Sequence, residues 1–290
     1  MGLRLKFNLV LFAVFAIGLA VTGYVSYELL HRNARQEVLR NAGVMMEAAL
    51  SMRGYTVTHV RPNLAVDADK FLPESVPAFG ATEIMTLLRK KYPDYAYKEA
   101  ALNPTNPRNR AVEWETDIVN VFRADPARPE ISGMRETPTG RSLYLARPLQ
   151  IRDDACLNCH TNAEMAPPAM VKLYGPDHGF GWKMNEVIAT QIVSVPMDLP
   201  IRNANHAFVT FMTSLTVVFA VLFVILNVML TLLIVQPITL LSRAADQISK
   251  GKLDSAEFPD KGRDEVSQLG QAFNRMRRSL EKAISLIDKG

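Results

Sequence analysis

Cysteine is nearly absent from this sequence, whose 290 residues include only Cys156 and Cys159. A structural zinc site normally needs four ligands, usually with a second Cys/Cys or His/His pair at close spacing. Apart from His160, which directly follows Cys159, the histidines stand singly along the chain, so such a site is not predicted. A thioredoxin-like redox pair usually follows a βαβ pattern, whereas these cysteines have polar, proline-containing flanks.

Strong net charge and catalytic motifs are also missing. The formal net charge is only +4, and no cluster of Lys and Arg alternates with aromatic residues. Nucleic-acid binding therefore has no support. The chain has no glycine-rich phosphate-binding loop, and it does not suggest a Ser/His/Asp arrangement. We therefore do not expect an enzyme.

What the sequence does contain is the run Cys156-Leu157-Asn158-Cys159-His160. Its spacing fits covalent attachment of one c-type haem, with Cys156 and Cys159 adding to the two vinyl groups as thioethers. His160 follows at once and is the predicted proximal iron ligand. A disulfide across this tight two-residue gap and a chance match are the alternatives. Haem is attached in this way outside the bacterial cytoplasm, so the run also indicates a side of the membrane.

Two long uncharged runs, residues 7–27 and 203–242, predict helices that span a membrane. A bilayer core of roughly 30 Å needs about 20 helical residues. A cleaved signal peptide is the alternative for the first run, but its apolar stretch exceeds the usual length of roughly 7–15 residues and lacks a convincing cleavage site. We expect spans at 7–30 and 207–235, and we expect Pro237 to break the second helix at the cytoplasmic edge.

The orientation follows from the haem pattern, because basic residues flank the first span on both sides and the positive-inside rule does not decide. Residues 31–206 would then form a periplasmic domain, anchored in the lipid of the bacterial inner membrane. Both ends of the chain, residues 1–6 and 236–290, would lie in the cytoplasm.

The segment between the spans has the composition of a mixed α/β domain. Residues 31–53 carry apolar side chains at three- and four-residue steps and predict a helical stalk that continues the first span. Residues 81–91 predict a second helix. Alternating or β-rich runs predict strands at 111–122, 142–151 and 186–195, the last leading into the second span. A small sheet flanked by helices suggests a PAS-like sensor domain, and the fold class is α+β.

Two turn-rich loops, residues 103–110 and 174–182, attract attention by their composition. The first is dense in proline and asparagine, and the second combines glycines with aromatic residues. Loops of this kind can wall a cofactor pocket, although ordinary surface connections have the same composition.

After the second span, two amphipathic helices joined by an extended connector are predicted. Gly251 ends the first helix, and the Asp264-Glu265 pair opens the second. The connector carries the apolar residues Leu253 and Phe258. One chain cannot bury both apolar seams, so we expect two copies to form a parallel four-helix bundle. The seam positions are Ile238, Leu241, Ala245 and Ile248, then Val266, Leu269, Phe273, Met276, Leu280, Ala283 and Ile287.

These patterns resemble two known families. Residues 237–287 resemble a HAMP domain, the relay module of bacterial transmembrane receptors. Residues 31–206 resemble a family first catalogued as a domain of unknown function and understood as a periplasmic, PAS-like sensor that binds haem c. The stretches that carry this second resemblance are 53–56, 103–109, 156–160 and 174–197.

The second resemblance implies a sixth iron ligand from the helix that opens the domain, in some members a cysteine. This chain has no third cysteine, so the position is either open or held by another residue. Met46 is the first candidate for this distal ligand, and Met45, Met52, His59 and His178 are the alternatives. Methionines on a helix are more often core filler.

Together these features predict a homodimeric membrane sensor. Its haem would detect redox state or a small gas, and the HAMP module would relay the signal to a separate cytoplasmic output protein, such as a kinase. The sequence ends at residue 290, directly after this module, so we expect either a separate output protein or an incomplete receptor. The alternative is a membrane-anchored electron-transfer cytochrome, which would have no use for the heptad-patterned segment. Nitric oxide, carbon monoxide, oxygen and redox poise are all open as stimuli.

Overall fold

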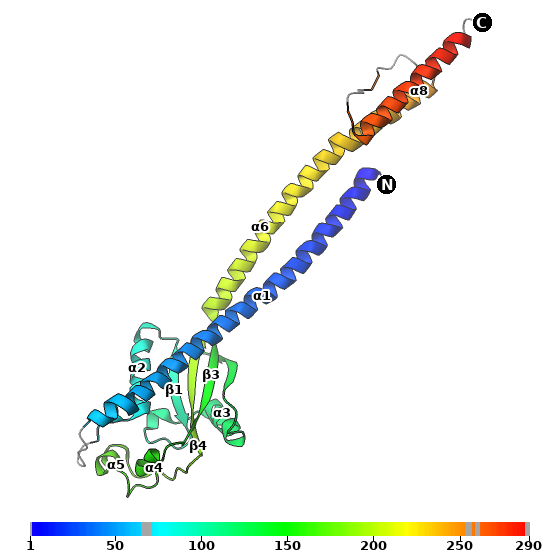
Figure 1. Cartoon of the computed structure of the whole chain (residues 1–290). Coiled ribbons are helices and arrows are strands. Elements are labelled where there is room, and N and C mark those ends of the chain that lie inside the picture. Colours follow the sequence, from blue (N-terminus) through cyan, green and yellow to red (C-terminus); the bar gives the residue numbers. More distant parts are fainter. Residues whose placement is uncertain (1, 65–70, 253–256, 259–261, 288–290) are drawn as a thin grey trace. The chain divides into compact units, whose positions relative to one another are not determined.

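The computed structural model describes residues 2–64, 71–252, 257–258 and 262–287, and the chain divides into two compact units. Residues 28–207 form the central unit, and residues 1–27 with 208–290 form the terminal unit. The helices α1 (Leu3–Tyr55) and α6 (Asp198–Leu230) each contribute to both units (Figure 1). The predicted combination of helices and sheet is confirmed.

The central unit is built on a four-stranded antiparallel sheet with the order β1-β4-β3-β2. The strands are β1 (Ala96–Ala101), β2 (Ile131–Thr137), β3 (Gly140–Gln150) and β4 (Val187–Pro196). β2 and β3 form a hairpin that turns at Gly140, whose φ of +110° favours glycine. β4 is last in sequence but lies between β1 and β3, so most of its residues are buried.

Helices cover the two faces of this sheet (Figure 1). α1 lies on one face and α3 (Glu113–Ala124) on the other. Neighbouring residues of a strand point to opposite faces, so Val193 packs on the α1 side and Ile192 on the α3 side. Each fully buried large side chain contributes about 1.5–3 kcal/mol. The α1 side of the core joins Val38, Ala42 and Met46 to Leu143, Leu145, Val193, Val195 and Met197, and the α3 side joins Ile118 and Phe122 to Ala100, Ala146, Val187 and Ile192.

The predicted strand at 111–122 is wrong, because these residues lie mainly in α3. Its buried residues Glu115, Ile118, Val119 and Phe122 recur at three- and four-residue steps, which is a helical period that the β-branched residues obscured. The predicted strands at 142–151 and 186–195 are confirmed as β3 and β4. The helices at 31–53 and 81–91 are confirmed by α1 and by α2 (Pro77–Lys91).

Sequence reasoning missed two strands. β1 has the sequence AYKEAA, and three alanines with two charges have little intrinsic preference for a strand. β2 contains a glycine and two charged residues, and it stands at the edge of the sheet. Both segments are strands because of their neighbours rather than their own composition.

Short helical segments connect the larger elements. They comprise η1 (Thr56–Val60), η2 (Arg61–Asn63), η3 (Pro73–Ser75), η4 (Pro107–Asn109), η5 (Asp154–Cys156), α4 (Leu157–His160) and α5 (Pro168–Tyr174).

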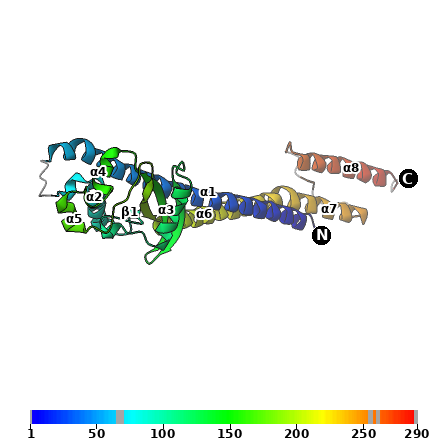
Figure 2. The ribbon, with the colours of Figure 1, turned by 90° about the horizontal axis from the view of Figure 1, so that it is seen from below.

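In the terminal unit, the first part of α1 and the later part of α6 lie side by side (Figures 1 and 2). Phe15 stacks on Phe219 with ring centroids 4.8 Å apart, and Tyr27 meets Phe208 edge-on at 5.6 Å. Two helical runs, Leu3–Asn63 and Asp198–Ser249, contain stretches long and apolar enough to cross a membrane. They are therefore candidate membrane helices, and they contain the predicted spans.

Pro237 does not break the second helical run, contrary to the prediction. α6 passes through a π-helical turn, η6 (Thr231–Val235), directly into α7 (Gln236–Ser249). Pro237 stands in the first turn of α7, where proline is well tolerated. Gly251, with φ +81°, lies just after the end of α7, as predicted, and its N–H donates to the carbonyl of Ile248.

The helix α8 (Glu265–Ile287) begins at the predicted position. Asp264 caps this helix, since Ser267 N donates to Asp264 Oδ1 at 2.7 Å. Hydrogen bonds from the side chain and the backbone of Ser267 hold the pKa of the Asp264 carboxyl below its usual value. Phe258 of the connector packs edge-on against Phe273 at 5.7 Å, which confirms it as an anchor. Leu253, the other predicted anchor, lies outside the described residues.

Candidate functional site

The Cys156–His160 segment follows β3 and forms a compact helical turn. Asp153 starts it, because its Oδ1 accepts a hydrogen bond from Ala155 N at 2.9 Å. η5 and α4 then carry Cys156, Cys159 and His160 over successive helical positions. Residues three and four apart lie on one face of a helix, so the segment presents both thiols and the imidazole within one turn.

Both cysteines are free thiols and half-buried. Cys156 packs against a buried cluster that includes Ile151 and Ile188, and Trp182 packs against the same cluster. Burial raises the pKa of both thiols, and the carboxylate of Asp153 adds to the rise at Cys156. At neutral pH both groups are therefore protonated thiols, and neither is engaged in a disulfide.

His160 is held in one orientation by two contacts. Its ring stacks on Trp182 with centroids 3.8 Å apart and an interplanar angle of 15°. Its Nδ1 lies 2.7 Å from the carbonyl oxygen of Gly179, whereas Thr105 Oγ1 is more distant at 3.5 Å. A carbonyl oxygen can only accept, so Nδ1 carries the proton and donates it. Nε2 is then the ring nitrogen with a lone pair, which is the arrangement of a histidine metal ligand.

Burial also lowers the pKa of His160, although the Gly179 carbonyl partly offsets this effect. The imidazole is therefore neutral at physiological pH. A neutral ring is the form that coordinates a metal ion.

The two turn-rich loops meet around this histidine. Asn103 Oδ1 accepts from Gly179 N at 3.2 Å, and Asn103 Nδ2 donates to the carbonyl of Phe180 at 3.3 Å. Gly179 has φ +84°, and a Cβ at that position would lie 2.7 Å from Thr105 Cα. The 103–110 loop thus positions the carbonyl that orients His160, a role that the composition of the loop did not predict.

Two arginines from the end of α1 and the following turn act electrostatically on the cysteines. The positive charges of Arg53 and Arg61 act on the thiol of Cys156, and Arg61 also acts on Cys159, in each case lowering the pKa against the effect of burial. A group bound by the cysteines would therefore lie near the C-terminal end of α1.

The structure brings Cys156, Cys159 and His160 together but places Met46 elsewhere. Met46 is fully buried in the α1 side of the core, in a cluster with Val38 and Ala42. To serve as a distal ligand, it would have to leave that core.

The alternative ligands are distributed differently. Met45 and Met52 are partly buried and pack against Ala81 and Met85. His59 is exposed and stacks on Tyr55, and His178 is exposed in the loop beside Gly179. Met52 directly precedes Arg53 in the sequence, and the positive charge of Arg53 acts on the thiol of Cys156.

The residues present fit a covalently attached haem with one histidine ligand. They supply two free thiols on one helical turn and a neutral imidazole whose second nitrogen is already hydrogen-bonded. Within the described part of the chain, no three His, Cys, Asp or Glu side chains gather to hold a bare metal ion.

Sequence reasoning missed the roles of Trp182, Gly179 and Asn103 at this site. The signal was partly visible, because residues 174–182 combine glycines with aromatic residues, a composition that can wall a cofactor pocket. Their target is the ring of His160, and only the folded chain shows this contact.

Two known protein families match parts of this chain. Residues 229–282 match the HAMP domain model, so the chain carries a signal-transduction module after its second candidate membrane helix. Residues 31–196 match the Tll0287-like model, and the chain therefore belongs to the Tll0287-like family. The predicted order of a sensor-family domain followed by HAMP is confirmed.

One solved structure is similar in shape. It is described as the crystal structure of the cyanobacterial heme-protein Tll0287, with 14% sequence identity and a TM-score of 0.44. The match covers 55% of this chain and 95% of that one. No curated protein matches the chain.

Proposed function

We propose that this chain is a transmembrane sensor that carries one covalently attached c-type haem at Cys156 and Cys159, with His160 as the proximal iron ligand. The observation that carries the proposal is the His160 geometry, in which Nδ1 donates to Gly179 and leaves Nε2 available beside two free thiols. The Tll0287-like family and the heme-protein named above support the same cofactor.

The proposal assigns the central unit to the periplasm of a bacterial inner-membrane protein. Haem is attached to such a motif outside the cytoplasm, so both chain ends would be cytoplasmic. Two copies would pair through the HAMP segment, whose apolar seams need partners. The output would be a separate cytoplasmic protein such as a kinase, and the chain itself would have no enzymatic activity.

The route of the signal follows from the elements that hold the site. When bound, the haem would supply a redox change or gas binding at its iron. Arg53 and Arg61, near the end of α1, lie within electrostatic reach of the attachment cysteines. α1 continues from the site into the terminal unit, and β4 leads through α6 into the same unit. A relative displacement of these two helices would favour one of two packings of the HAMP bundle.

The first test is attachment. The full chain, expressed in a host that matures c-type cytochromes, should give the pyridine haemochrome spectrum of a haem with two thioethers. The Cys156→Ser/Cys159→Ser variant should come out without bound pigment. Colourless wild-type protein would overturn the haem assignment.

The second test separates a sensor from an electron-transfer cytochrome. Hydrogen exchange in α7 and α8 of the full chain should differ between the oxidised, reduced and carbon monoxide-treated forms. Identical exchange in all three forms, together with fast electron transfer to a soluble partner, would favour the cytochrome.

A further inference from the structure

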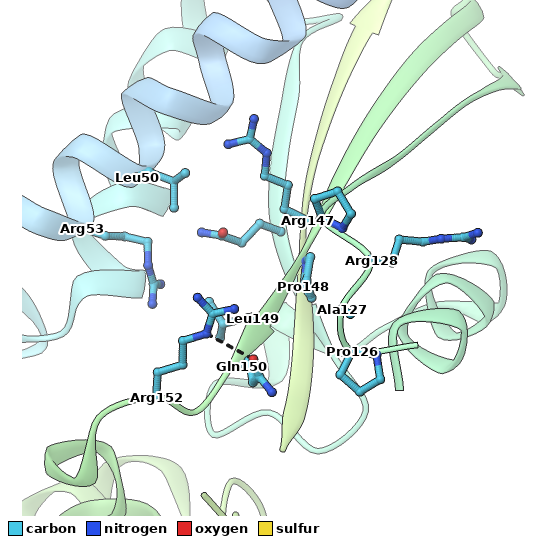
Figure 3. A pocket seen from close by; sticks show the side chains of 12 residues that line it. Leu50, Arg53, Pro126, Ala127, Arg128, Arg147, Pro148, Leu149, Gln150 and Arg152 are labelled. Atoms are coloured by element: carbon cyan, nitrogen blue, oxygen red, sulfur yellow. Dashed lines mark hydrogen bonds between the residues drawn. The ribbon is translucent and has the colours of Figure 1, made fainter. Parts of the chain in front are cut away.

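A cleft in the central unit is lined by several arginine side chains (Figure 3). Its volume is about 410 Å³, which lies in the range of roughly 300–1,000 Å³ typical of small-molecule sites. Twelve residues line it, of which four are arginines and none is acidic. The lining comprises Leu50, Arg53, Pro126, Ala127, Arg128, Pro129, Arg147, Pro148, Leu149, Gln150, Arg152 and Gln191.

Three of the arginines come from different elements. Arg53 lies on α1, Arg147 on β3, and Arg152 on the segment after β3. In Figure 3, the side chains of Arg53 and Arg152 point toward one another across the cleft. Proline and leucine side chains provide the apolar part of its wall.

Two of these arginines form short ion pairs with carboxylates outside the lining, and Arg128 forms a longer one of 3.7 Å with Asp125. Arg53 Nη1 is 2.7 Å from both carboxylate oxygens of Glu99. Arg147 Nη1 is 2.6 Å from Glu47, and its Nε is 3.3 Å from Glu130. These pairs orient the guanidinium groups before any ligand arrives, which lowers the cost of binding.

Donors are left over for a ligand. A guanidinium carries five N–H donors. Among the described residues, the hydrogen bonds of Arg53 use Nη1 alone, and Arg152 uses Nε alone, donating to Gln150 Oε1 at 3.1 Å. The free N–H groups suit planar, bidentate acceptors such as carboxylates.

We propose that this cleft binds the carboxylate groups of an anionic ligand through Arg53, Arg147 and Arg152. Two sources have this chemistry. One is the pair of propionates of a haem held at Cys156, a source that rests on the proposed function. The other is a free dicarboxylate, which does not depend on it.

The position of the cleft accommodates both sources. Arg152 lies four residues before Cys156 in the sequence. The positive charge of Arg53 lowers the pKa of the Cys156 thiol against the effect of burial. The cleft is therefore close in sequence to the attachment segment, and Arg128 and Arg152 of its lining are exposed to solvent.

Arg152→Gln is the informative variant. Arg152 is exposed and bonds only to Gln150 among the described residues, so the fold should survive its loss. Arg141→Gln is the matched control, because Arg141 is an exposed arginine of β3 outside the lining with a long 3.8 Å pair to Glu136.

The experiment uses the full chain in its haem-loaded form and as the Cys156→Ser/Cys159→Ser variant, each titrated with succinate by calorimetry. If propionates fill the cleft, succinate binds only the variant without haem. Arg152→Gln then lowers the midpoint potential of the haem, because losing a positive charge favours the ferric iron, while Arg141→Gln does not. If a free dicarboxylate is the ligand, both forms bind succinate, and Arg152→Gln weakens binding by about tenfold or more.

Either readout supports the cleft as a carboxylate site. The proposal is overturned if neither form binds succinate and the potential of Arg152→Gln equals that of wild type. It is also overturned if Arg141→Gln has the same effect as Arg152→Gln, since general surface charge then explains the result. If no haem attaches at all, the proposed function fails, but succinate binding by the full chain still decides this inference.

Discussion

Arg53 and Glu99 join α1 to β1 through an ion pair in which Arg53 Nη1 lies 2.7 Å from both carboxylate oxygens. The Glu99 side chain is only 4% exposed. It also accepts a hydrogen bond from the Tyr97 hydroxyl at 2.7 Å, and Gln191 Nε2 donates to that hydroxyl at 3.0 Å. Burial and the Glu99 charge raise the pKa of Tyr97 far above its usual value, so the hydroxyl stays protonated. α1 is thus fastened to the sheet beside the candidate site.

Replacing Arg53 should destabilise the central unit. Arg53→Gln leaves the Glu99 carboxylate buried without its counter-charge, at a cost of about 3 kcal/mol, the low end for a buried pair because Arg53 is partly exposed. The thermal unfolding midpoint of the full chain should fall by about 6 °C or more. Arg141→Gln, at an exposed pair, should change stability by less than about 0.5 kcal/mol. Equal midpoints for the two variants would contradict a structural role for the Arg53–Glu99 pair.

A methyl group at residue 179 should disturb the site more than one at residue 181. Gly179 and Gly181 have similar positive φ values, +84° and +81°, so alanine pays roughly 1–2 kcal/mol of backbone strain at either position. Only at Gly179 would the new Cβ also collide with Thr105; at Gly181 nothing lies within 4 Å. Gly179→Ala should therefore unfold at a lower temperature than Gly181→Ala and bind less haem. If the two variants unfold at the same temperature and bind the same amount of haem, the loop around Thr105 moves to accommodate the new methyl group.

The prediction of haem attachment at residues 156–160 needs only residue types and their spacing within one short segment, so it could be made from the sequence. It also predicted α1 and the two longest strands, whose periodic patterns are strong. The strands β1 and β2 were missed, since pairing with neighbours rather than local composition makes them strands.

The surroundings of His160 depend on contacts between distant parts of the chain. Asn103 and Gly179 are 76 residues apart in sequence, yet they share a hydrogen bond. No local pattern encodes such a pair. The same holds for the cleft lined by arginines, whose residues come from α1, the loop after α3, β3 with the segment after it, and β4.

Loss of the Asn103 side chain should change the properties of the iron more than the stability of the fold. Asn103→Ala removes the bonds that hold the 179–180 backbone, so the Gly179 carbonyl orients His160 less firmly. If His160 is the iron ligand, as proposed, a weaker hydrogen bond from Nδ1 makes its imidazole a poorer donor to iron, which should raise the midpoint potential of the haem. Redox titration of the full chain checks this, with Asn109→Ala in the same loop as control. A potential shifted equally by both changes would indicate a general loosening of the loop.

The sixth iron ligand can be tested with two matched substitutions. Met46→Leu nearly conserves volume in the α1 side of the core, so it should cost less than about 1.5 kcal/mol. If Met46 is the distal ligand, its loss changes the optical spectrum of the ferric haem and opens the site to carbon monoxide. Met52→Leu is the comparison, because Met52 directly precedes Arg53, whose positive charge acts on the Cys156 thiol. A spectrum altered only by Met52→Leu would remove Met46 as a candidate.

The side chain of Asn274 should hold the connector of the HAMP segment against α8 at Phe258. It is buried, its Oδ1 accepts from Phe258 N at 3.2 Å, and its Nδ2 donates to the Phe258 carbonyl at 3.0 Å. Asn274→Ala removes both bonds, each contributing about 1 kcal/mol, so the connector should detach more often from α8. Hydrogen exchange at the Phe258 amide should then be faster by about tenfold or more. Ser279→Ala is the control, because Ser279 bonds only within α8 among the described residues, to the carbonyl of Arg275. Unchanged exchange at Phe258 in Asn274→Ala would mean that the Phe258–Phe273 contact alone holds the connector.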